Sequence, residues 1–448
     1  MKLRNLISEL DRILLREYRY DAELFDELTG LQRSSGIMHG DRPICPFLRP
    51  YFLESSRYQA IRSAAHVLSG AFDSLTKAAL EYHELIETLG MTEAEERFAR
   101  FDPGYESVAV TSRLDTFLHA DGFKFLEYNA ENPAGVGDQA ALEALFTHVP
   151  AVREFLNEHA HFFPQPHLKL LEVLERAYRE YGGKKAVPNI AIVDWTGIDT
   201  SSEFEILRLF FESRGYSTIV CDPNEMEYDG ENLHVGAFEV DILYKRVIIH
   251  EFLERFDEAH AISRAMAEGT VCMANSFRSK IPHKKSSFAI LSDDRFHRLF
   301  TSEQVNAIRE HIPWTRKVRE GETTYANDTV DLLDYIRLER FRFVLKPNDD
   351  YGGKGIVFGW ESTESEWDDA IETALAANHV VQERAEVEKT DIPVFLDGEA
   401  RIESLTVDFD PFLFMGDVDG GMVRLAAGSL VNITQGGGET ALAILEGI

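Results

Sequence analysis

The chain has 448 residues, enough for about three domains, and its 44% hydrophobic and 27% charged residues are ordinary for a soluble globular enzyme. Its 46 basic residues are outnumbered by 77 acidic ones, and the resulting net charge of −31 argues against nucleic acid or an anionic membrane as a partner. Three distant cysteines without CxxC spacing argue against a disulfide scaffold and a structural zinc site. With a charged N-terminus and no long apolar run, the chain is expected to be a reduced, cytoplasmic protein.

The first hundred residues have a helical pattern. Apolar side chains recur at helical spacing between residues 61 and 75, and Gly90 stands where a helix would end. Thr92 and Glu95 then form the capping-box pattern of a further short helix. We therefore expect a helical N-terminal region.

The pattern changes to a period of two after Ser107. SVAVTSRLDTFLHA, the turn signal Asp121-Gly122 and FKFLEYNA together predict a β-hairpin. A helical stretch from about residue 140 to residue 181 follows it, up to a break at 182–188.

Residues 189–275 alternate between strand and helix. NIAIVDW, STIVCD and VDILYKR are strand-like, and SSEFEILRLFFESRG predicts a helix that ends near Gly215. The rest of the chain is mixed and then rich in strands, with turn signals at Asp397-Gly398, Asp410-Pro411 and Asp419-Gly420.

The stretch FVLKPNDDYGGKGIVFGW, residues 343–360, is typical of a nucleotide site. It predicts a strand that ends in Lys346, a glycine loop and a second strand. The three glycines, Gly352, Gly353 and Gly355, let backbone N–H groups approach phosphate oxygens. A lysine adds positive charge there, and a neighbouring carboxylate can hold magnesium. Taken alone, the stretch is equally compatible with a tight hairpin whose charges are solvated.

Glu127 and Asn129, in FLEYNAENPAG, lie two positions apart on a predicted strand and therefore point the same way. A carboxylate and an amide oxygen side by side suit Mg²⁺, which shares such ligands with substrate phosphates. Without other signals, an ordinary polar face of a hairpin would be the simpler interpretation.

The turn of the hairpin decides whether Arg113 and Asp115 share the face of Glu127. A two-residue loop would point Arg113 away from Glu127, so we expect a three-residue loop with a left-handed Gly122. This register pairs Asp115 with Glu127. It also pairs Arg113 with Asn129. The alternative is a surface ion pair between Arg113 and Asp115, which stabilises little. The opposite, apolar face would then carry Val108, Val110, Leu114, Leu118, Leu126 and Tyr128.

Further basic residues stand at the ends of predicted elements, and in a chain of net charge −31 their gathering would indicate a positive pocket. Residues 380–387, VVQERAEV, predict a strand whose backbone at Gln382 and Glu383 can pair with an adenine edge. A C-terminal glycine loop at 436–438, after Asn432, is a second place for a close approach to a ligand. The basic residues are Lys284, Lys285, Arg246 and Arg424.

The order of these motifs resembles the circularly permuted group of ATP-grasp ligases, which includes eukaryotic-type glutathione synthetase and the synthetase domain of glutathionylspermidine synthetase. The resemblance spans roughly residue 112 to the C-terminus. It rests on Lys285 before a helix, KPxxxxGGKG at Lys346, VVQE at Gln382, and an ExN pair that lies far upstream at Glu127. It implies an α/β (α+β) ATP-grasp fold, circularly permuted, with a helical N-terminal region and a small inserted α/β substrate domain.

The same resemblance implies three parts of the chain. Residues 1–181 would hold the helical region and the hairpin with the metal-binding part of the core. Residues 189–275 would form the small substrate-binding domain. Residues 276–448 would form the nucleotide-binding region with a lid.

The implied activity is that of an ADP-forming, ATP-dependent carboxylate–amine ligase that acts through an acyl phosphate on a small amino-acid or peptide-like substrate, with ATP and Mg²⁺. The implied metal ligands are Glu127, Asn129 and Asp350. The implied ATP contacts are Lys285 (Lys284 stays an alternative), Lys346, Gly352, Gly353, Lys354, Val381, Gln382 and Glu383. The implied acid-substrate contacts are Arg113, Asp115, Asn132 and Arg246, and the implied catalytic residues are Arg113, Lys346 and Arg424.

The chain departs from glutathione synthetase after the ExN pair, where Asn132, Pro133 and Ala134 replace small hydroxyl residues, and glutathione is therefore not implied as the product. The expected partners are a small-molecule acid and amine, and a homodimer is left open. A small-molecule kinase of the same fold and a non-catalytic ATP-binding protein are the alternatives.

Overall fold

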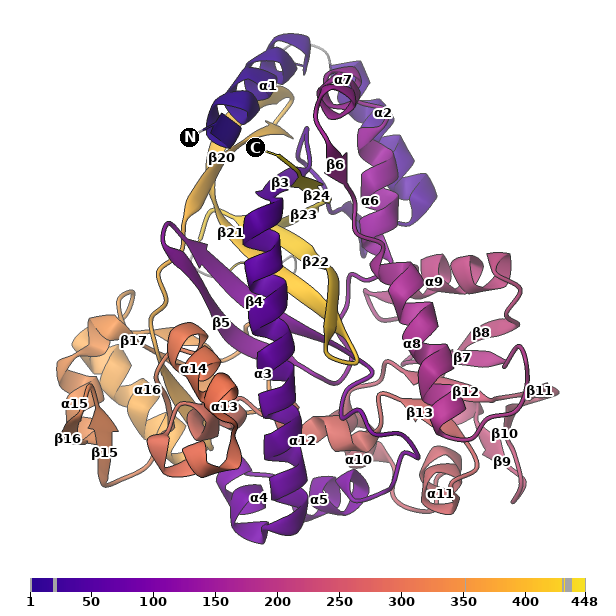
Figure 1. Cartoon of the computed structure of the whole chain (residues 1–448), viewed down its shortest axis with the longest axis vertical. Coiled ribbons are helices and arrows are strands. Elements are labelled where there is room, and N and C mark those ends of the chain that lie inside the picture. Colours follow the sequence, from indigo (N-terminus) through magenta and orange to yellow (C-terminus); the bar gives the residue numbers. More distant parts are fainter. Residues whose placement is uncertain (1, 19–21, 351, 429–430, 432–436, 448) are drawn as a thin grey trace.

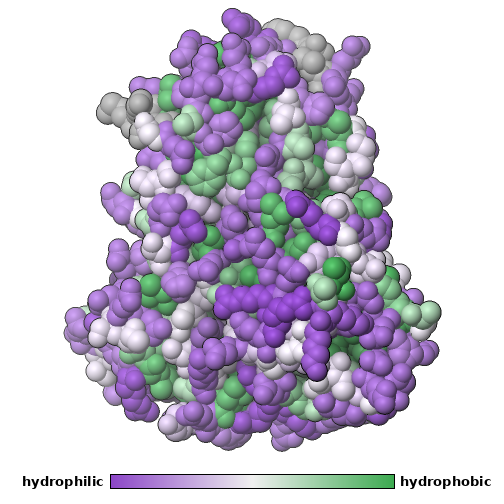
Figure 2. Space-filling model, turned by 45° about the vertical axis from the view of Figure 1, so that its right-hand side comes forward, coloured by the Kyte–Doolittle hydropathy of each residue, from purple (hydrophilic) through white to green (hydrophobic). Residues whose placement is uncertain are grey.

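The computed structural model describes residues 2–18, 22–350, 352–428, 431 and 437–447. Three larger sheets and the long helix α3 (Ser55–Glu81) dominate the fold (Figure 1). None of the helices in the described part of the chain combines the length and the apolar character that a bilayer crossing requires. One face of the molecule is mostly hydrophilic, with apolar side chains in small groups (Figure 2).

The central sheet is antiparallel and joins the predicted hairpin to the C-terminal strands. Its order is β23-β22-β21-β4-β5, and β20 also pairs with β21. The strands are β4 (Thr111–His119), β5 (Gly122–Asn129), β20 (Lys389–Leu396), β21 (Glu399–Phe414), β22 (Asp417–Ala426) and β23 (Gly438–Thr440).

Helix α3 crosses one face of this sheet (Figure 1). The apolar residues that predicted the helix are all fully buried, and the ring of Phe72 stacks on that of Tyr128 in β5 with 4.2 Å between centroids. This burial fixes which face of the hairpin is apolar and leaves the other face to the polar residues. Helices α4 (His83–Leu89) and α5 (Glu93–Ala99) follow, separated by a left-handed Gly90 and the predicted capping box of Thr92.

The second sheet has the order β14-β19-β17-β18 and carries the glycine loop between β17 and β18. Trp367 and Ile371 of α16 are buried with Phe343 and Val381 of the sheet in one apolar cluster. The elements are α13 (Ser286–Leu291), β14 (Thr315–Lys317), α15 (Leu332–Leu338), β17 (Phe343–Pro347), β18 (Val357–Phe358), α16 (Glu364–Ala376) and β19 (His379–Glu383).

The third sheet is parallel, with the order β13-β12-β7-β8, and is built within residues 190–274. Strands β7 and β12 are buried along their whole length, which explains their continuous apolar sequence. The α/β pattern predicted for this segment is confirmed, whereas the division of the whole chain into three domains stays a prediction. The elements are β7 (Ile190–Val193), α9 (Ser201–Ser213), β8 (Thr218–Cys221), β12 (Ile242–Lys245), α10 (Ile249–Arg255), α11 (Ala261–Glu268) and β13 (Cys272–Ala274).

Prolines divide the stretch that we expected to be one helical run before this sheet. It contains α6 (Asp138–Phe146), α7 (Pro150–Glu158), the short strand β6 (His161–Phe162) and α8 (Pro166–Glu180). Pro150 and Pro166 each stand at the start of a helix, where the missing N–H has no intrahelical partner to lose.

Two of the predicted turns lie inside strands instead. Asp410-Pro411 belongs to β21, where a register shift between Pro411 and Leu413 accommodates the proline. Asp419-Gly420 belongs to β22, and the chain reverses earlier, around Gly416.

Candidate active site

The polar face of the hairpin lines a cavity of about 970 Å³. The cavity is lined by β4 and β5, by the glycine loop, by β21 and β22, and by the loops that follow β7 and β12. Segments that are far apart in the sequence therefore share one space, as the motif order predicted.

The register of the hairpin is the predicted one, but it arises from a different turn. Asp115 pairs with Glu127 and Arg113 with Asn129, while the turn has two residues and Gly122 pairs with His119 as the first residue of β5. A β-bulge at Leu126, between Asp115 and Thr116 of the opposite strand, restores the register. Each bulge adds one residue to one strand and so reverses which side chains share a face.

The bulge also moves Leu126 from the expected apolar face to the cavity. Its carbonyl accepts hydrogen bonds from Lys346 Nζ (3.3 Å) and Gln382 Nε2 (3.4 Å). Lys346 Nζ donates a further bond to Gln382 Oε1 at 2.7 Å. Burial lowers the pKa of Lys346 to about 8, with Lys285 adding to this effect and Glu127 opposing it.

Lys285 joins the hairpin to the root of the glycine loop. Its Nζ lies 3.1 Å from Glu127 Oε1 and donates to the backbone carbonyl of Asp350 at 2.6 Å. The backbone N–H groups of Lys285 and Ser286 donate to Asn348, and these bonds attach the loop root to the start of α13. Of the two lysines, Lys285 is thus the one that contacts Glu127 of the cavity wall.

Lys284 belongs to a buried group of charges beneath the loop, which we call the loop-root cluster: Glu95, Glu131, Lys280, Lys284 and Asp349. Asp349 forms ion pairs with Lys280 and Lys284, both at 2.6 Å, and Lys280 Nζ lies 2.8 Å from Glu131. Burial raises the pKa of Asp349, but the two lysines outweigh it and hold the pKa below its usual value. Asp349 is therefore an anchor of the loop.

Asp350, the predicted metal ligand, has an exposed side chain that does not line the cavity. Gly352, Gly353 and Lys354 do line it. The two glycines have φ of +67° and +75°, in the left-handed region that side chains disfavour, so glycine is required at this turn.

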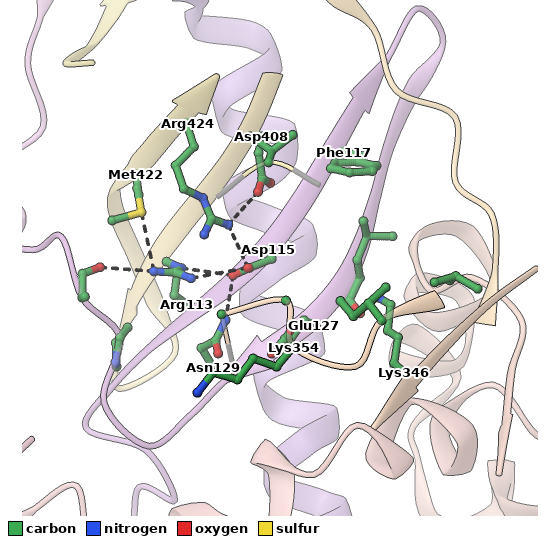
Figure 3. Close-up of a pocket in the computed structure, with 18 of the residues that line it drawn as sticks. Arg113, Asp115, Phe117, Glu127, Asn129, Lys346, Lys354, Asp408, Met422 and Arg424 are labelled. Carbon is green, nitrogen blue, oxygen red and sulfur yellow. Dashed lines mark hydrogen bonds and ion pairs between the residues drawn. The ribbon is translucent and has the colours of Figure 1, made fainter. Parts of the chain in front are cut away.

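A second group of charges, the cavity cluster, consists of Arg113, Asp115, Asp408, Asp410 and Arg424. Arg424 Nη2 lies 2.9 Å from Asp115, 2.6 Å from Asp408 and 2.6 Å from Asp410. Figure 3 shows Arg424 and Asp408 reaching toward Asp115 from neighbouring strands, with Asn129 below it. One oxygen of each carboxylate lies within 4.8 Å of the others, and the guanidinium takes the position that a cation would hold.

Arg113, the predicted acid-binding residue, is already hydrogen-bonded inside this cluster. Its Nε donates to Asp115 at 3.0 Å, and its Nη1 donates to the carbonyl of Ala134 at 3.2 Å. Asn129 Nδ2 also donates to Asp115, at 2.8 Å. Burial raises the pKa of Asp115, but Arg113 and Arg424 outweigh it and keep this carboxyl ionised.

Asp408 and Asp410 were missed by the sequence analysis. They alternate on β21, a spacing that places both side chains on the face of Arg424, but Asp410-Pro411 also has the composition of a turn. Asp410 is fully buried, and its Oδ1 accepts the N–H of Thr116 at 3.1 Å where the register of β21 shifts.

Arg246 and Asn132 lie toward the parallel sheet at the other end of the cavity. Arg246 is buried and donates to the carbonyl of Pro133 at 2.6 Å and to the hydroxyl of Tyr244 at 3.2 Å. Asn132 donates to the backbone carbonyl of Arg246. Glu203 lies 3.6 Å from the same guanidinium. Asn132 and Arg246 thus connect the loop after β5 with the end of β12.

Strand β19, which we expected to bind adenine through its backbone, is a central strand of the second sheet. Strand β19 pairs with β14 on one side and β17 on the other, so the peptide groups of Val381 and Gln382 are already used in the sheet. The segment that follows, 383–387, contributes Glu383, Arg384, Ala385 and Val387 to the cavity wall. Of the C-terminal glycine loop, Asn432 and Gly436 lie outside the described residues.

No protein-family model and no curated protein matches this chain. Among solved structures, it is similar to a glutathione synthetase-like effector from Globodera pallida in its apo form, with 14% identity, 96% of this chain and 97% of that chain covered, and a TM-score of 0.60. A more distant likeness is to a putative γ-glutamylcysteine synthetase from Methylobacillus flagellatus, with 10% identity, 81% and 83% covered, and a TM-score of 0.41. The first likeness confirms the predicted mixed α/β fold class, which this chain shares with the glutathione synthetase-like effector, whereas the circular permutation stays a prediction.

Proposed function

We propose that the protein is an ATP-dependent ligase that joins a carboxylate to an amine through an acyl phosphate and releases ADP. The observation that carries the proposal is that Glu127, Lys346 and the loop Gly352–Lys354 line one cavity, while Lys285 contacts Glu127 and the root of that loop from behind the cavity wall. These are the groups that a triphosphate and its metal require: a glycine-rich backbone, two cations and a carboxylate.

ATP would lie with its phosphates between Lys285, Lys346 and the loop Gly352–Lys354. Gln382 holds Lys346 in place through its side chain, since its peptide group is already paired. The adenine would then face the end of β19 and the loop after it, from residue 383 to residue 387.

Magnesium fits the same end of the cavity. Asn129 points its amide nitrogen at Asp115, so its oxygen is turned away and is available beside the carboxylate of Glu127. Such hard oxygen ligands suit Mg²⁺, which neutralises phosphate charge when it is bound. Asp350 would join them only if its exposed side chain turned inward with the loop.

The chain's own residues would direct the chemistry as follows. The carboxylate substrate attacks the γ-phosphorus of ATP, and Lys285 and Lys346 stabilise the charge on the transferred group. The resulting acyl phosphate reacts readily with water, so the glycine loop has to close over it first. An amine then attacks the acyl carbon, and phosphate leaves.

A screen of amino acids and short peptides against amines, followed by ADP release and mass spectrometry of the product, tests the proposal. We expect amine-dependent ADP release that Lys346→Ala lowers by about 100-fold or more, because the cation on the γ-phosphate is lost. Lys184→Ala, an exposed lysine on a loop, is the matched control and should behave as the wild type. A stable phosphorylated acid without amide would indicate a kinase, and no ADP release with any acid would refute the proposal.

A further inference from the structure

The cavity cluster contains more negative than positive groups. Three carboxylates face two guanidinium groups. A single nitrogen, Arg424 Nη2, forms ion pairs with all three carboxylates. Arg113 turns mainly to Asp115 and lies 3.7 Å from Asp410. Asp408 and Asp410 are therefore only partly compensated.

Asp408 has one oxygen without a partner. Its side chain is 6% exposed, and its Oδ2 accepts the ion pair from Arg424. Its Oδ1 is buried and has no hydrogen-bond partner among the described residues, although Asp408 lines the cavity (Figure 3). A buried carboxylate oxygen without a donor is unfavourable, and it suits a ligand that brings an N–H group.

We propose that Asp408 receives the amine substrate as an ammonium ion and takes a proton from it. The inference rests on the proposed function, since it assigns the second substrate of that reaction to a place and to a chemical class. Asp408 would then be a catalytic residue, whereas Asp410 and Arg424 would position it.

The proton balance of the reaction requires such a group. An ammonium ion has no lone pair, so one proton must move to Asp408 before the nitrogen can attack the acyl carbon. The second proton leaves the nitrogen with the phosphate as the C–N bond forms and the C–O bond breaks. Asp408 returns its proton to solvent when the products leave.

The surroundings of Asp408 favour proton uptake. Burial raises the pKa of its carboxyl, and Arg424 together with a hydrogen bond from the side chain of Asp410 opposes this only in part. A carboxyl with a raised pKa is a better proton acceptor near neutral pH than an ordinary aspartate. The charged groups that face it are Arg424 of β22, Arg113 and Asp115 of β4, Asp410 of β21 and Lys346 of β17.

Two kinds of nucleophile separate this role from a structural one. Hydroxylamine is uncharged at neutral pH and needs no proton acceptor, whereas methylamine, glycine and ammonium ion are protonated there. The experiment supplies ATP, Mg²⁺ and a panel of amino acids and dipeptides as acids, and it compares hydroxamate with amide formation. The variant is Asp408→Asn, which keeps the shape and removes the charge.

We expect Asp408→Asn to lower amide formation from the protonated amines by about 100-fold and to leave hydroxamate formation within about threefold of the wild type. The amide rate of the variant should recover as the pH rises, because more of the amine is then already deprotonated. Asp397→Asn, an aspartate with an 87% exposed side chain in the turn between β20 and β21, is the control and should change neither rate.

Three results would overturn the inference. If hydroxamate and amide fall together, Asp408 only positions Arg424. If neither falls, the amine binds elsewhere. If the wild type makes hydroxamate but no amide from any of the amines, the ammonium site does not exist. Absence of ADP and of hydroxamate with every acid would instead refute the proposed function, and the inference with it.

Discussion

The loop-root cluster and the cavity cluster each set three carboxylates against two strong cations, yet the pKa values of Asp408 and Asp410 in the cavity cluster shift in the opposite direction from those of Glu131 and Asp349 in the loop-root cluster. In the loop-root cluster, the carboxyl of Glu131 is buried, but Lys280 outweighs the burial and lowers its pKa to about 2. In the cavity cluster, burial raises the pKa of Asp408 and raises that of Asp410 well above its usual value, although Arg424 opposes both shifts. We call the loop-root cluster closed, because its cations lower the pKa of Glu131 and Asp349. We call the cavity cluster open, because Asp408 and Asp410 keep a raised pKa.

The arrangement of the cations explains the difference. Each lysine of the loop-root cluster lies between carboxylates, and Lys284 contacts both Glu95 at 2.8 Å and Asp349 at 2.6 Å. In the cavity cluster, the three carboxylates crowd around one guanidinium nitrogen. A cluster whose cations each lie between carboxylates stabilises a loop, whereas a cluster whose carboxylates share one nitrogen beside a cavity is suited to a ligand.

The largest effect that we expect is a loss of stability when a cation is removed from the closed cluster. Lys280 is fully buried between Glu131 and Asp349, so Lys280→Met leaves two carboxylates with one cation fewer. We expect the free energy of unfolding to fall by about 3–5 kcal/mol, measured by denaturant titration. Lys184→Met, at an exposed lysine, should change it by less than about 0.5 kcal/mol. Equal stability of Lys280→Met and the wild type would show that the network is not stabilising.

Much of the nucleotide end of the cavity could be predicted from the sequence, because its residues lie in motifs. Glu127, Asn129, Lys285, Lys346 and the glycine loop have fixed spacings on strands and turns, and the structure brings them to one cavity or to its edge. The fold class follows from the same patterns and from the alternation of strand and helix in residues 189–275.

The rest depends on local irregularities that leave no clear signal. The bulge at Leu126 compensates for a turn that is one residue shorter than expected. Asp408 and Asp410 were not predicted, because Asp410-Pro411 has the composition of a turn although a register shift keeps it inside β21. Asp350 and Asp349 are adjacent acids, and only the packing of Lys280 and Lys284 decides which of them faces inward.

A smaller effect is expected in the open cluster. Arg113→Ala removes the Nε bond to Asp115 and leaves the bonds that Asp115 receives from Arg424 and Asn129. If the acid substrate binds here, we expect its KM to rise by about tenfold, which corresponds to about 1.4 kcal/mol. ATP affinity, measured by calorimetry, should stay unchanged. An equal loss of ATP and acid binding would show that Arg113 supports the nucleotide site instead.

The smallest effect concerns the pH dependence of stability, and it distinguishes the two clusters by sign. The pKa of Asp410 is raised in the folded protein, so its contribution to stability is fully present below its unfolded pKa of about 4 and is lost as the pH rises toward the folded pKa. Asp410→Asn lacks this dependence but can still accept the N–H of Thr116. The destabilisation caused by this variant should therefore shrink between pH 4 and pH 8.

Asp349→Asn is the matched opposite in the closed cluster. The pKa of Asp349 is lowered in the folded protein, so its contribution is present above the unfolded pKa of about 4 and is lost as the pH falls through the folded pKa. Denaturant titrations of both variants at pH 2, 4, 6 and 8 should thus give opposite trends: the destabilisation falls between pH 4 and pH 8 for Asp410→Asn, and it grows between pH 2 and pH 4 for Asp349→Asn. If the destabilisation depended on pH in the same way for both variants, the pKa values of Asp410 and Asp349 would be shifted in the same direction. The distinction between a closed and an open cluster would then be wrong.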